Sequence, residues 1–244
     1  MPKYKAIVEY DGTEFCGFQR QATDRTVQGE LEAALHDLAG MPVSLVGAGR
    51  TDSGVHAAGQ VIAFSLPWSH SPDDLLQAVN VRLAWDVSLV KVEPASAEFH
   101  PRYDAVRRHY QYRILNRAVR SPLQRRFGLH VREPLDVDAM DQAAQALLGE
   151  HDFIAFGRPP QGTNSVRHVF RAECRRQGEI VTFDVEAKAF LYRMVRRMVG
   201  TLLRVGRGEI SAQQLASLLA GTSRGTAGPT VPPCGLCLMA VYYD

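Results

Sequence analysis

Hydrophobic residues in the first 92 positions switch repeatedly between a two-residue and a helical period, and this order restricts the folds open to the chain. Strand-like apolar runs occur at 3–10, 43–46, 56–66 and 87–92. Helical spacing occurs at 27–38 and 73–83, where Thr26 and Ser71 are positioned to cap the helix N-termini. The resulting order, strand–helix–strand–strand–helix–strand, is the split pattern of ferredoxin-like α+β folds.

The second part of the chain repeats this alternation less regularly. Strands are predicted at 108–115, 166–175, 180–186 and 236–243. Helices are predicted at 137–148, 190–205 and 211–220. We therefore expect an α+β protein of two ferredoxin-like, RRM-like domains with antiparallel sheets and a cleft between them. The N-terminal domain is expected over 1–104 and the C-terminal domain over 105–244.

The composition is that of an ordinary globular protein and excludes several other classes. Of 244 residues, 45% are hydrophobic and 22% are charged, which is too apolar for a disordered chain. No run of about 18 apolar residues exists, so no membrane-spanning helix is expected. The N-terminal segment reaches Glu9 and Asp11 before any long apolar stretch, which argues against a secretory signal. We expect a soluble, cytoplasmic protein whose four cysteines are reduced.

Positive charge is concentrated in the second part of the chain. Residues 1–99 hold 7 Lys and Arg against 13 Asp and Glu, whereas residues 100–244 hold 21 against 13. Arg outnumbers Lys by 24 to 4, and nine Arg lie between Arg102 and Arg132, interleaved with aromatic residues. A run of charge is commonly a solvated face, but Arg interleaved with aromatics is also the expected footprint of nucleic-acid binding. On the second interpretation, Arg102 and Arg107 are candidate substrate contacts.

The segment from Gly47 to His56, GAGRTDSGVH, carries the most specific local signal. It lacks the third glycine of a dinucleotide-binding loop and the Gly-Lys-Ser/Thr of a phosphate-binding P-loop. It offers Arg50, Thr51 and Asp52 on a glycine-bracketed turn between two predicted strands. One interpretation is that Asp52 only bonds its own turn, as Asx residues often do. An adjacent Arg and three glycines within eight residues are more than such a turn needs, so Asp52 is a candidate catalytic carboxylate.

Six motifs resemble, in the same order along the chain, those of the tRNA pseudouridine synthase A family. They are EYDGTEFCGFQRQ, TVQGELEAAL, GAGRTDSGVHA, FHPRYDAVRRHYQY, FLYRMVRRMVG and GLCLMAVYY. Phe18, Ser53 and Lys188 depart from the residues that are commoner at these places in the family. None of the three belongs to the presumed chemistry.

The resemblance implies an isomerase that converts uridine to pseudouridine at positions 38, 39 and 40, in the anticodon stem-loop of tRNA. It also implies a homodimer with tRNA lying across both subunits. The reaction breaks the N1–C1′ bond, turns the uracil and rejoins it through C5, so no electrons or atoms are gained and no cofactor is expected. By resemblance Asp52 is the nucleophile, and Arg50 holds the extruded uridine, whose unstacking costs a few kcal/mol.

Two further residues, Arg196 and Tyr110, gain a role from the resemblance. Arg196 lies on the flank of a predicted helix, between an apolar face and a face of other arginines, where a snorkelling side chain is the plain alternative. The MVR motif makes Arg196 the cation that acts with Asp52, which has to begin the reaction ionised. Tyr110 and Tyr112 share one face of a strand, where packing is the common role, and the resemblance assigns Tyr110 to stack on the target uracil. His56 is a candidate substrate contact that alternatively orients the loop beside the turn.

Two other functions stay open on the sequence alone. A non-catalytic RRM-like RNA-binding protein would need the basic half but not the Arg-Thr-Asp turn. A carboxylate-dependent nucleoside glycosidase would need a second acid to activate water, and none stands out beside Asp52.

Cys234 and Cys237 form a CxxC pair with too few further ligands for a structural zinc site, so no metal is expected.

Overall fold

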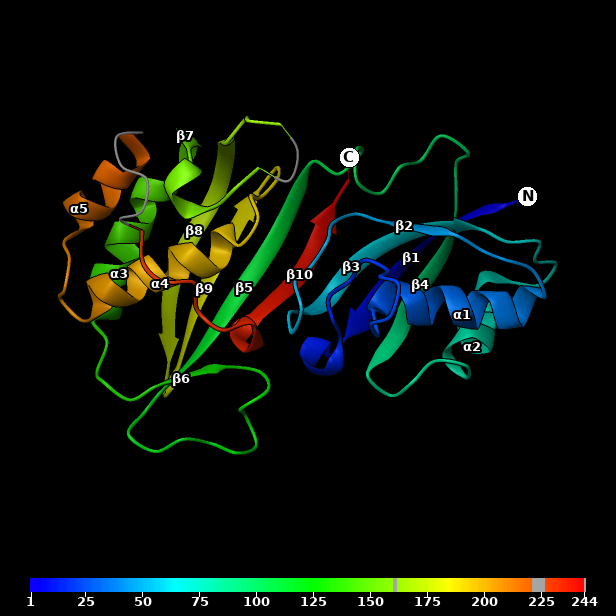
Figure 1. Cartoon of the computed structure of the whole chain (residues 1–244), viewed down its shortest axis with the longest axis horizontal. Coiled ribbons are helices and arrows are strands. Elements are labelled where there is room, and N and C mark those ends of the chain that lie inside the picture. The colour runs from blue at the N-terminus through cyan, green and yellow to red at the C-terminus, as the bar shows by residue number, and fades with distance from the viewer. Residues whose placement is uncertain (160–161, 221–226, 244) are drawn as a thin grey trace. The chain divides into compact units, whose positions relative to one another are not determined.

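The computed structural model describes residues 1–159, 162–220 and 227–243 (Figure 1). The chain forms two compact units. The first comprises Met1–Val106 together with Cys237–Asp244, and the second comprises Arg107–Leu236. Each unit combines helices with a mostly antiparallel set of strands, which confirms the α+β class predicted from the sequence.

The first unit is built around strand β1. Its strands are β1 (Lys3–Tyr10), β2 (Leu45–Gly47), β3 (His56–Ser65), β4 (Val87–Ala95) and β10 (Leu236–Tyr242). Strand β1 pairs antiparallel with β3 on one edge and with β4 on the other. The far edge of β3 pairs antiparallel with β2 and, through His56 and Ala57, parallel with β10. The predicted order of strands and helices over residues 1–95 is confirmed.

Two helices connect these strands, and each begins where the sequence provides a cap. Helix α1 (Val27–Ala39) begins after Thr26, whose side chain accepts a hydrogen bond from the first turn, and it ends at a left-handed glycine. Helix α2 (Pro72–Asn80) begins after Ser71, which forms a reciprocal capping box with Asp74. Such caps satisfy backbone N–H groups that a helix leaves unpaired, so local sequence accounts for both helix starts.

The last strand belongs to the first unit, which differs from the expected division after residue 104. Strand β10 runs beside β3, where the carbonyl of Met239 lies so close to Gly59 that a Cβ built there would stand 2.3 Å from the oxygen. The Tyr243 hydroxyl donates to the carbonyl of Pro101 at 2.8 Å. The C-terminal segment is therefore tied to the first unit by contacts that a linear division of the chain cannot represent.

The second unit is built on the antiparallel strands β5, β9, β8 and β7, in that order, with β6 added parallel to β5. Its strands are β5 (Arg107–Asn116), β6 (Leu129–Val131), β7 (Gly149–Asp152), β8 (Val166–Gln177) and β9 (Ile180–Ala187). Its helices are α3 (Val137–Ala144), α4 (Met194–Gly206) and α5 (Ala212–Ser217). Helix α3 packs on β8 and on the other two helices (Figure 1).

Short 3-10 turns complete the described elements. They are η1 (Gly12–Glu14), η2 (Gln145–Leu147), η3 (Ile154–Phe156), η4 (Leu218–Ala220) and η5 (Pro233–Gly235). Helix α3 passes into η2, so the helix predicted to extend to residue 148 changes its hydrogen-bonding pattern after Ala144. Helix α4 begins at Met194 instead of 190, because Arg193 adopts a left-handed conformation with φ of 63°.

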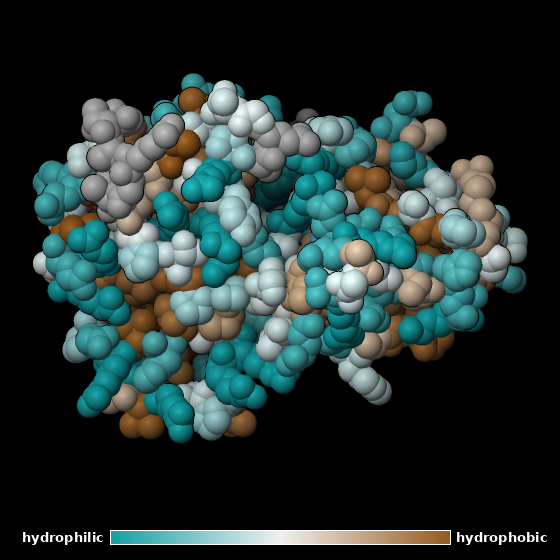
Figure 2. All heavy atoms as spheres, in the orientation of Figure 1, coloured by the Kyte–Doolittle hydropathy of each residue, from teal (hydrophilic) through white to brown (hydrophobic). Residues whose placement is uncertain are grey.

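Apolar side chains fill the interior of each unit. Fully buried examples are Phe15, Leu31, Leu35 and Ile62 in the first unit and Tyr112, Phe153, Phe156 and Phe183 in the second. Figure 2 shows one face of the molecule, on which hydrophilic residues predominate and hydrophobic ones are scattered. Across the described ranges, no helix has the length and apolar character needed to span a membrane.

Replacing Gly59 with Ala tests the place of β10. The added Cβ would stand 2.3 Å from the Met239 oxygen, so we expect Gly59→Ala to lower the free energy of unfolding by about 1–3 kcal/mol. Denaturant unfolding measures this change. Gly128→Ala is the control, because a Cβ there meets its nearest atom at 3.7 Å, an ordinary contact. Equal stability of the two variants would mean that β10 does not pack beside Gly59.

Candidate active site

The Arg-Thr-Asp turn at 50–52 is held by the loop that follows β1. The Phe18 N–H donates to the Thr51 carbonyl at 3.1 Å, and the Gly54 N–H donates to the Phe15 carbonyl at 3.3 Å. The loop therefore binds the backbone of the turn and of the residues directly after it. Each bond satisfies a backbone group that would otherwise lack a partner, so the path of the turn is fixed within the first unit.

Within the turn, exposure changes from one residue to the next. Thr51 is buried, and its hydroxyl lies 2.8 Å from the hydroxyl of Tyr10 at the end of β1. Arg50 is exposed and Asp52 is half-buried. The Asp52 carbonyl accepts a hydrogen bond from the Val55 N–H at 3.1 Å, which closes the turn. The buried Thr51 thus anchors the turn, and its two sequence neighbours, Arg50 and Asp52, are more accessible to solvent.

His56, at the start of β3, is buried beside the same loop. Its Nδ1 accepts a hydrogen bond from the Gly12 N–H at 3.0 Å and lies 3.2 Å from Oδ1 of Asp11. These contacts correspond to the loop-orienting role that the sequence left open for His56. Its role as a substrate contact stays a prediction.

The two tyrosines of β5 have different surroundings in the second unit. Tyr112 is fully buried, its hydroxyl donates to the Pro232 carbonyl at 2.8 Å, and burial raises the pKa of Tyr112 above its ordinary value. Tyr110 is half-buried, and its ring meets Phe190 edge to face, with 5.1 Å between ring centroids and 85° between ring planes. Tyr112 therefore packs in the core, as expected, and Phe190 orients the more accessible ring of Tyr110.

Arg196 is the third residue of α4 and is half-buried. Its Nε donates to the carbonyl of Val231 at 2.7 Å, and its own carbonyl accepts from the Val231 N–H at 3.4 Å. The segment carrying Val231 is itself attached to α4, because the Gly228 N–H donates to the Thr201 hydroxyl at 2.8 Å. Arg196 is therefore a cation of defined orientation, which distinguishes it from a snorkelling surface arginine.

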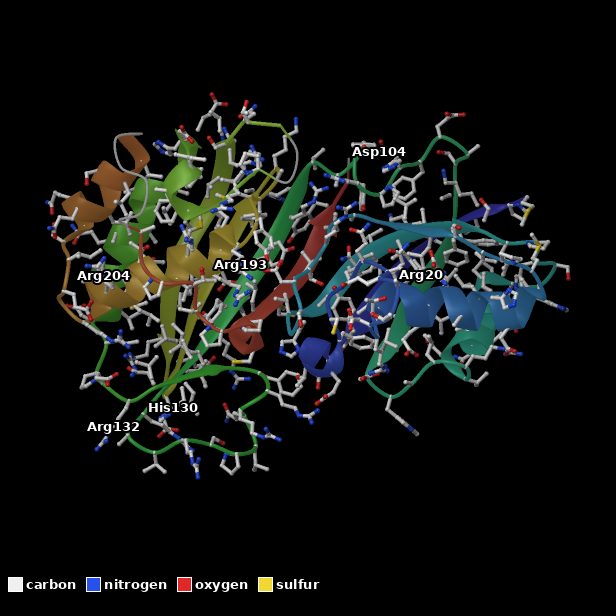
Figure 3. The ribbon with its side chains drawn as sticks, in the orientation of Figure 1. Arg20, Asp104, His130, Arg132, Arg193 and Arg204 are labelled. Atoms are coloured by element: carbon white, nitrogen blue, oxygen red, sulfur yellow. The ribbon has the colours of Figure 1, made fainter. Side chains whose placement is uncertain are left out.

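The basic stretch contains arginines with structural contacts and arginines that are exposed. Arg107 binds the buried carboxylate of Glu186 at 3.1 Å, and the Arg102 guanidinium lies 5.9 Å from the ring centroid of Tyr103. The exposed arginines of the stretch are Arg120, Arg125 and Arg132. Figure 3 shows Arg132 at the outer edge of the second unit. Some arginines of the stretch therefore make contacts within the protein, and others are exposed to solvent.

In the CxxC pair, Cys234 lies in η5 and Cys237 lies near the start of β10. Burial raises the pKa of Cys237 to about 11 and also raises the pKa of Cys234 above its ordinary value. Both thiols are therefore protonated near neutral pH, which makes them weak metal ligands and weak nucleophiles. Among the residues that the structure describes, no three His, Cys, Asp or Glu side chains are grouped as a metal site would require.

Sequence patterns did not reveal three contacts that position these side chains. Alternation along β1 predicts that Tyr10 is buried, but it does not identify a partner 41 residues away at Thr51. Phe190 belongs to the FLYRMVR motif, and its aromatic type was the available signal for a contact with Tyr110. Arg197, which helical spacing groups with exposed arginines, is half-buried and donates to the Ala155 carbonyl at 3.1 Å.

The Tyr10–Thr51 bond can be tested by a double-mutant cycle. Thr51→Val and Tyr10→Phe each remove one hydroxyl from a buried pair, so each should cost about 1–3 kcal/mol of unfolding free energy. The double variant should lose less than the sum of the two, with a coupling energy of about 0.5 kcal/mol or more measured by denaturant unfolding. Strict additivity would show that the two hydroxyls do not stabilise each other.

Comparison with known proteins agrees with the resemblance found in the motifs. A family model described as tRNA pseudouridine synthase matches residues 6–104 and 143–244. The tRNA pseudouridine synthase A of Geobacter sp. (strain M21) is 42% identical over 100% of this chain and 99% of its own length. That of Acidiphilium cryptum (strain JF-5) is 45% identical, over 100% of this chain and 97% of its own. That of Xanthomonas euvesicatoria pv. vesicatoria (strain 85-10) is 44% identical, over 99% and 95%.

These matches cover both units and include the Arg-Thr-Asp turn, β5 from Arg107 to Asn116, and α4. The agreement therefore extends over the whole architecture and is not limited to one motif. The chain belongs to the tRNA pseudouridine synthase A family.

Proposed function

We propose that this chain isomerises uridine to pseudouridine in tRNA, at positions 38, 39 and 40 of the anticodon stem-loop. It acts without a cofactor, in the cytoplasm, as a homodimer with tRNA lying across both subunits. The observation that carries the proposal is the Arg-Thr-Asp turn, whose backbone is fixed by buried contacts in a member of this family.

The reaction requires rearrangement without net transfer of atoms or electrons. The N1–C1′ bond of the uridine breaks, the uracil turns while it is held, and a C5–C1′ bond forms. The proton on C5 is lost and N1 gains one, so substrate and product have the same composition. A single carboxylate is sufficient for this sequence, and Asp52, half-buried on its fixed turn, is the proposed nucleophile.

The other residues have supporting roles in the proposal. Arg50, exposed and two positions before Asp52, holds the extruded nucleotide. Arg196, oriented by Val231, is the cation that acts with Asp52, since a nearby positive charge favours an ionised carboxylate. Tyr110 stacks on the target uracil. Additional RNA contacts are proposed for His56, Arg102 and Arg107.

A non-catalytic RNA-binding protein is the second candidate function. Its requirement for basic residues is met equally well by residues 100–244. No observation favours it over catalysis. Exposed arginines would serve RNA binding in an enzyme and in a non-catalytic protein alike, so they do not distinguish the two functions. The Arg-Thr-Asp turn, whose Thr51 is bound by Tyr10, has a use in an enzyme, whereas a simple binder has no need of it.

Asp52→Asn is the direct test of the nucleophile. The amide keeps the size of the side chain but cannot attack as a carboxylate, so we expect no pseudouridine from the variant. Binding of tRNA should stay within about tenfold of wild type, because one charge changes among many contacts. Product formation and tRNA affinity are measured on the same preparation. Turnover near the wild-type rate would remove Asp52 from the mechanism.

Substitutions at Tyr110 separate stacking from proton transfer. Tyr110→Leu removes a base–aromatic contact of roughly 1–3 kcal/mol and should greatly reduce turnover. Tyr110→Phe keeps the ring, so it stays active if stacking is the only role, and loses a further factor on the order of 10²–10⁴ if the hydroxyl moves the proton. Single-turnover rates distinguish these cases.

Tyr112→Phe is the matched control for the Tyr110 variants. It removes the bond to Pro232, which should cost about 1 kcal/mol of stability and leave turnover unchanged. Normal turnover in Tyr110→Leu together with an inactive Tyr112→Phe would require the two assignments to be withdrawn.

The basic half of the chain predicts that tRNA binding weakens steeply with salt. Neutralising several phosphates releases condensed cations, so a plot of log affinity against log salt should have a slope of magnitude well above one. Neutral substitutions among the exposed arginines of the second unit should reduce that slope more than substitutions in the first unit. A flat dependence between low and physiological salt would identify the arginines as a solvated face only.

A further inference from the structure

An exposed aromatic ring and two arginines form a separate cluster in the second unit, consisting of Arg158, Tyr192 and Arg193. The Tyr192 side chain is 50% exposed, and the Arg193 guanidinium carbon lies 4.8 Å from its ring centroid. The Tyr192 N–H donates to the Arg158 carbonyl at 2.9 Å, in an isolated antiparallel bridge between these two residues. Figure 3 shows Arg193 beside the start of α4.

In the part of the chain that the structure describes, no carboxylate pairs with the arginines of this cluster, Arg158 and Arg193. Many other arginines of the second unit form such ion pairs, and these include Arg107, Arg117, Arg171, Arg175, Arg204 and Arg207. Guanidinium groups beside an exposed aromatic ring suit a ligand that has both an anionic group and a planar ring.

The backbone at Arg193 keeps its side chain in the cluster. Arg193 is the only non-glycine residue with a positive φ in the part of the chain that the structure describes. This conformation is uncommon for a residue with a Cβ. The left-handed backbone of Arg193 precedes α4, which begins at the next residue, and the Arg193 guanidinium lies over the ring of Tyr192. Glycine would fit the same backbone at least as well.

The cluster shares one short segment with two residues of the proposed site. Phe190, which packs on Tyr110, lies two residues before Tyr192. Arg196 lies four residues after Tyr192, in the first turn of α4. The segment 190–196 therefore combines the support for the uracil-stacking tyrosine, the cluster and the proposed cation.

We propose that Tyr192 and Arg193 bind a nucleotide that neighbours the target uridine in the RNA. The exposed ring of Tyr192 stacks on its base, and Arg193 and Arg158 bind its phosphate. The proposal rests on the proposed function, because it assumes an RNA substrate that reaches the 190–196 segment. The proposal gives a binding role to residues that take no part in breaking the N1–C1′ bond or forming the C5–C1′ bond.

The variant Arg193→Gly gives the sharpest test, because glycine suits the left-handed backbone while the guanidinium is lost. We expect tRNA affinity, measured with unmodified tRNA in an Asp52→Asn background, to fall about tenfold or more. In the otherwise wild-type chain, KM should rise by a similar factor and kcat should change little. The thermal midpoint should be equal to or above that of wild type, which excludes misfolding as the cause.

Tyr192 provides a test without a change of charge. Tyr192→Leu should reduce affinity by about the same factor as Arg193→Gly, whereas Tyr192→Phe should stay close to wild type because the ring is kept. Arg82→Gln is the charge control: it removes one positive charge from the first unit, where Arg82 pairs with exposed Asp37, and should leave affinity and KM unchanged.

Wild-type affinity and KM in both Arg193→Gly and Tyr192→Leu would overturn the inference. The proposed function has a separate criterion, since its failure would appear as a wild-type enzyme that makes no pseudouridine. The tRNA affinity measurement does not depend on turnover, so it tests the cluster even if the wild-type enzyme makes no pseudouridine.

Discussion

The hydrogen bond between the hydroxyls of Tyr10 and Thr51 joins the first strand of the chain to the turn that carries the candidate nucleophile. Both residues are buried, so separating them would leave polar groups out of contact with water at a cost of about 1–3 kcal/mol. The loop that follows β1 adds backbone hydrogen bonds to the turn. At Gly17 in this loop, with φ of 90°, a Cβ would stand 2.9 Å from the Thr51 carbonyl oxygen. The position of Asp52 within the first unit follows from these contacts.

The second unit orients its own candidate residues by the same means. Arg196 is fixed through Nε by the Val231 carbonyl, and Tyr110 is fixed by the edge of Phe190. In one case a backbone carbonyl and in the other a neighbouring aromatic ring restrains a side chain that is itself only half-buried. Such support reduces the reorganisation needed when a substrate binds, which is how an enzyme holds reactive groups near their working geometry.

Local patterns in the sequence predicted most of the elements, because caps and periodicity are properties of neighbouring residues. Thr26 and Ser71 begin the helices that follow them, and β1 spans the predicted 3–10. Strands β6 and β7, with three and four residues, are too short to show a period. The left-handed Arg193 and the return of β10 to the first unit depend on tertiary contacts, so no local pattern indicates them. Similarly, the motifs identified the candidate residues but not the partners that orient them.

Mapping of pseudouridine in an unmodified tRNA transcript tests the central claim most directly. The transcript is incubated with the purified chain in the presence of a chelator and without any added cofactor, and each uridine is then read at single-nucleotide resolution. The account predicts conversion at positions 38, 39 and 40, wherever the transcript has uridine, and no release of free uracil. Release of uracil would indicate a glycosidase, and a bound but unmodified transcript would indicate an RNA-binding protein, so either result would contradict the assignment of an isomerase built on Asp52.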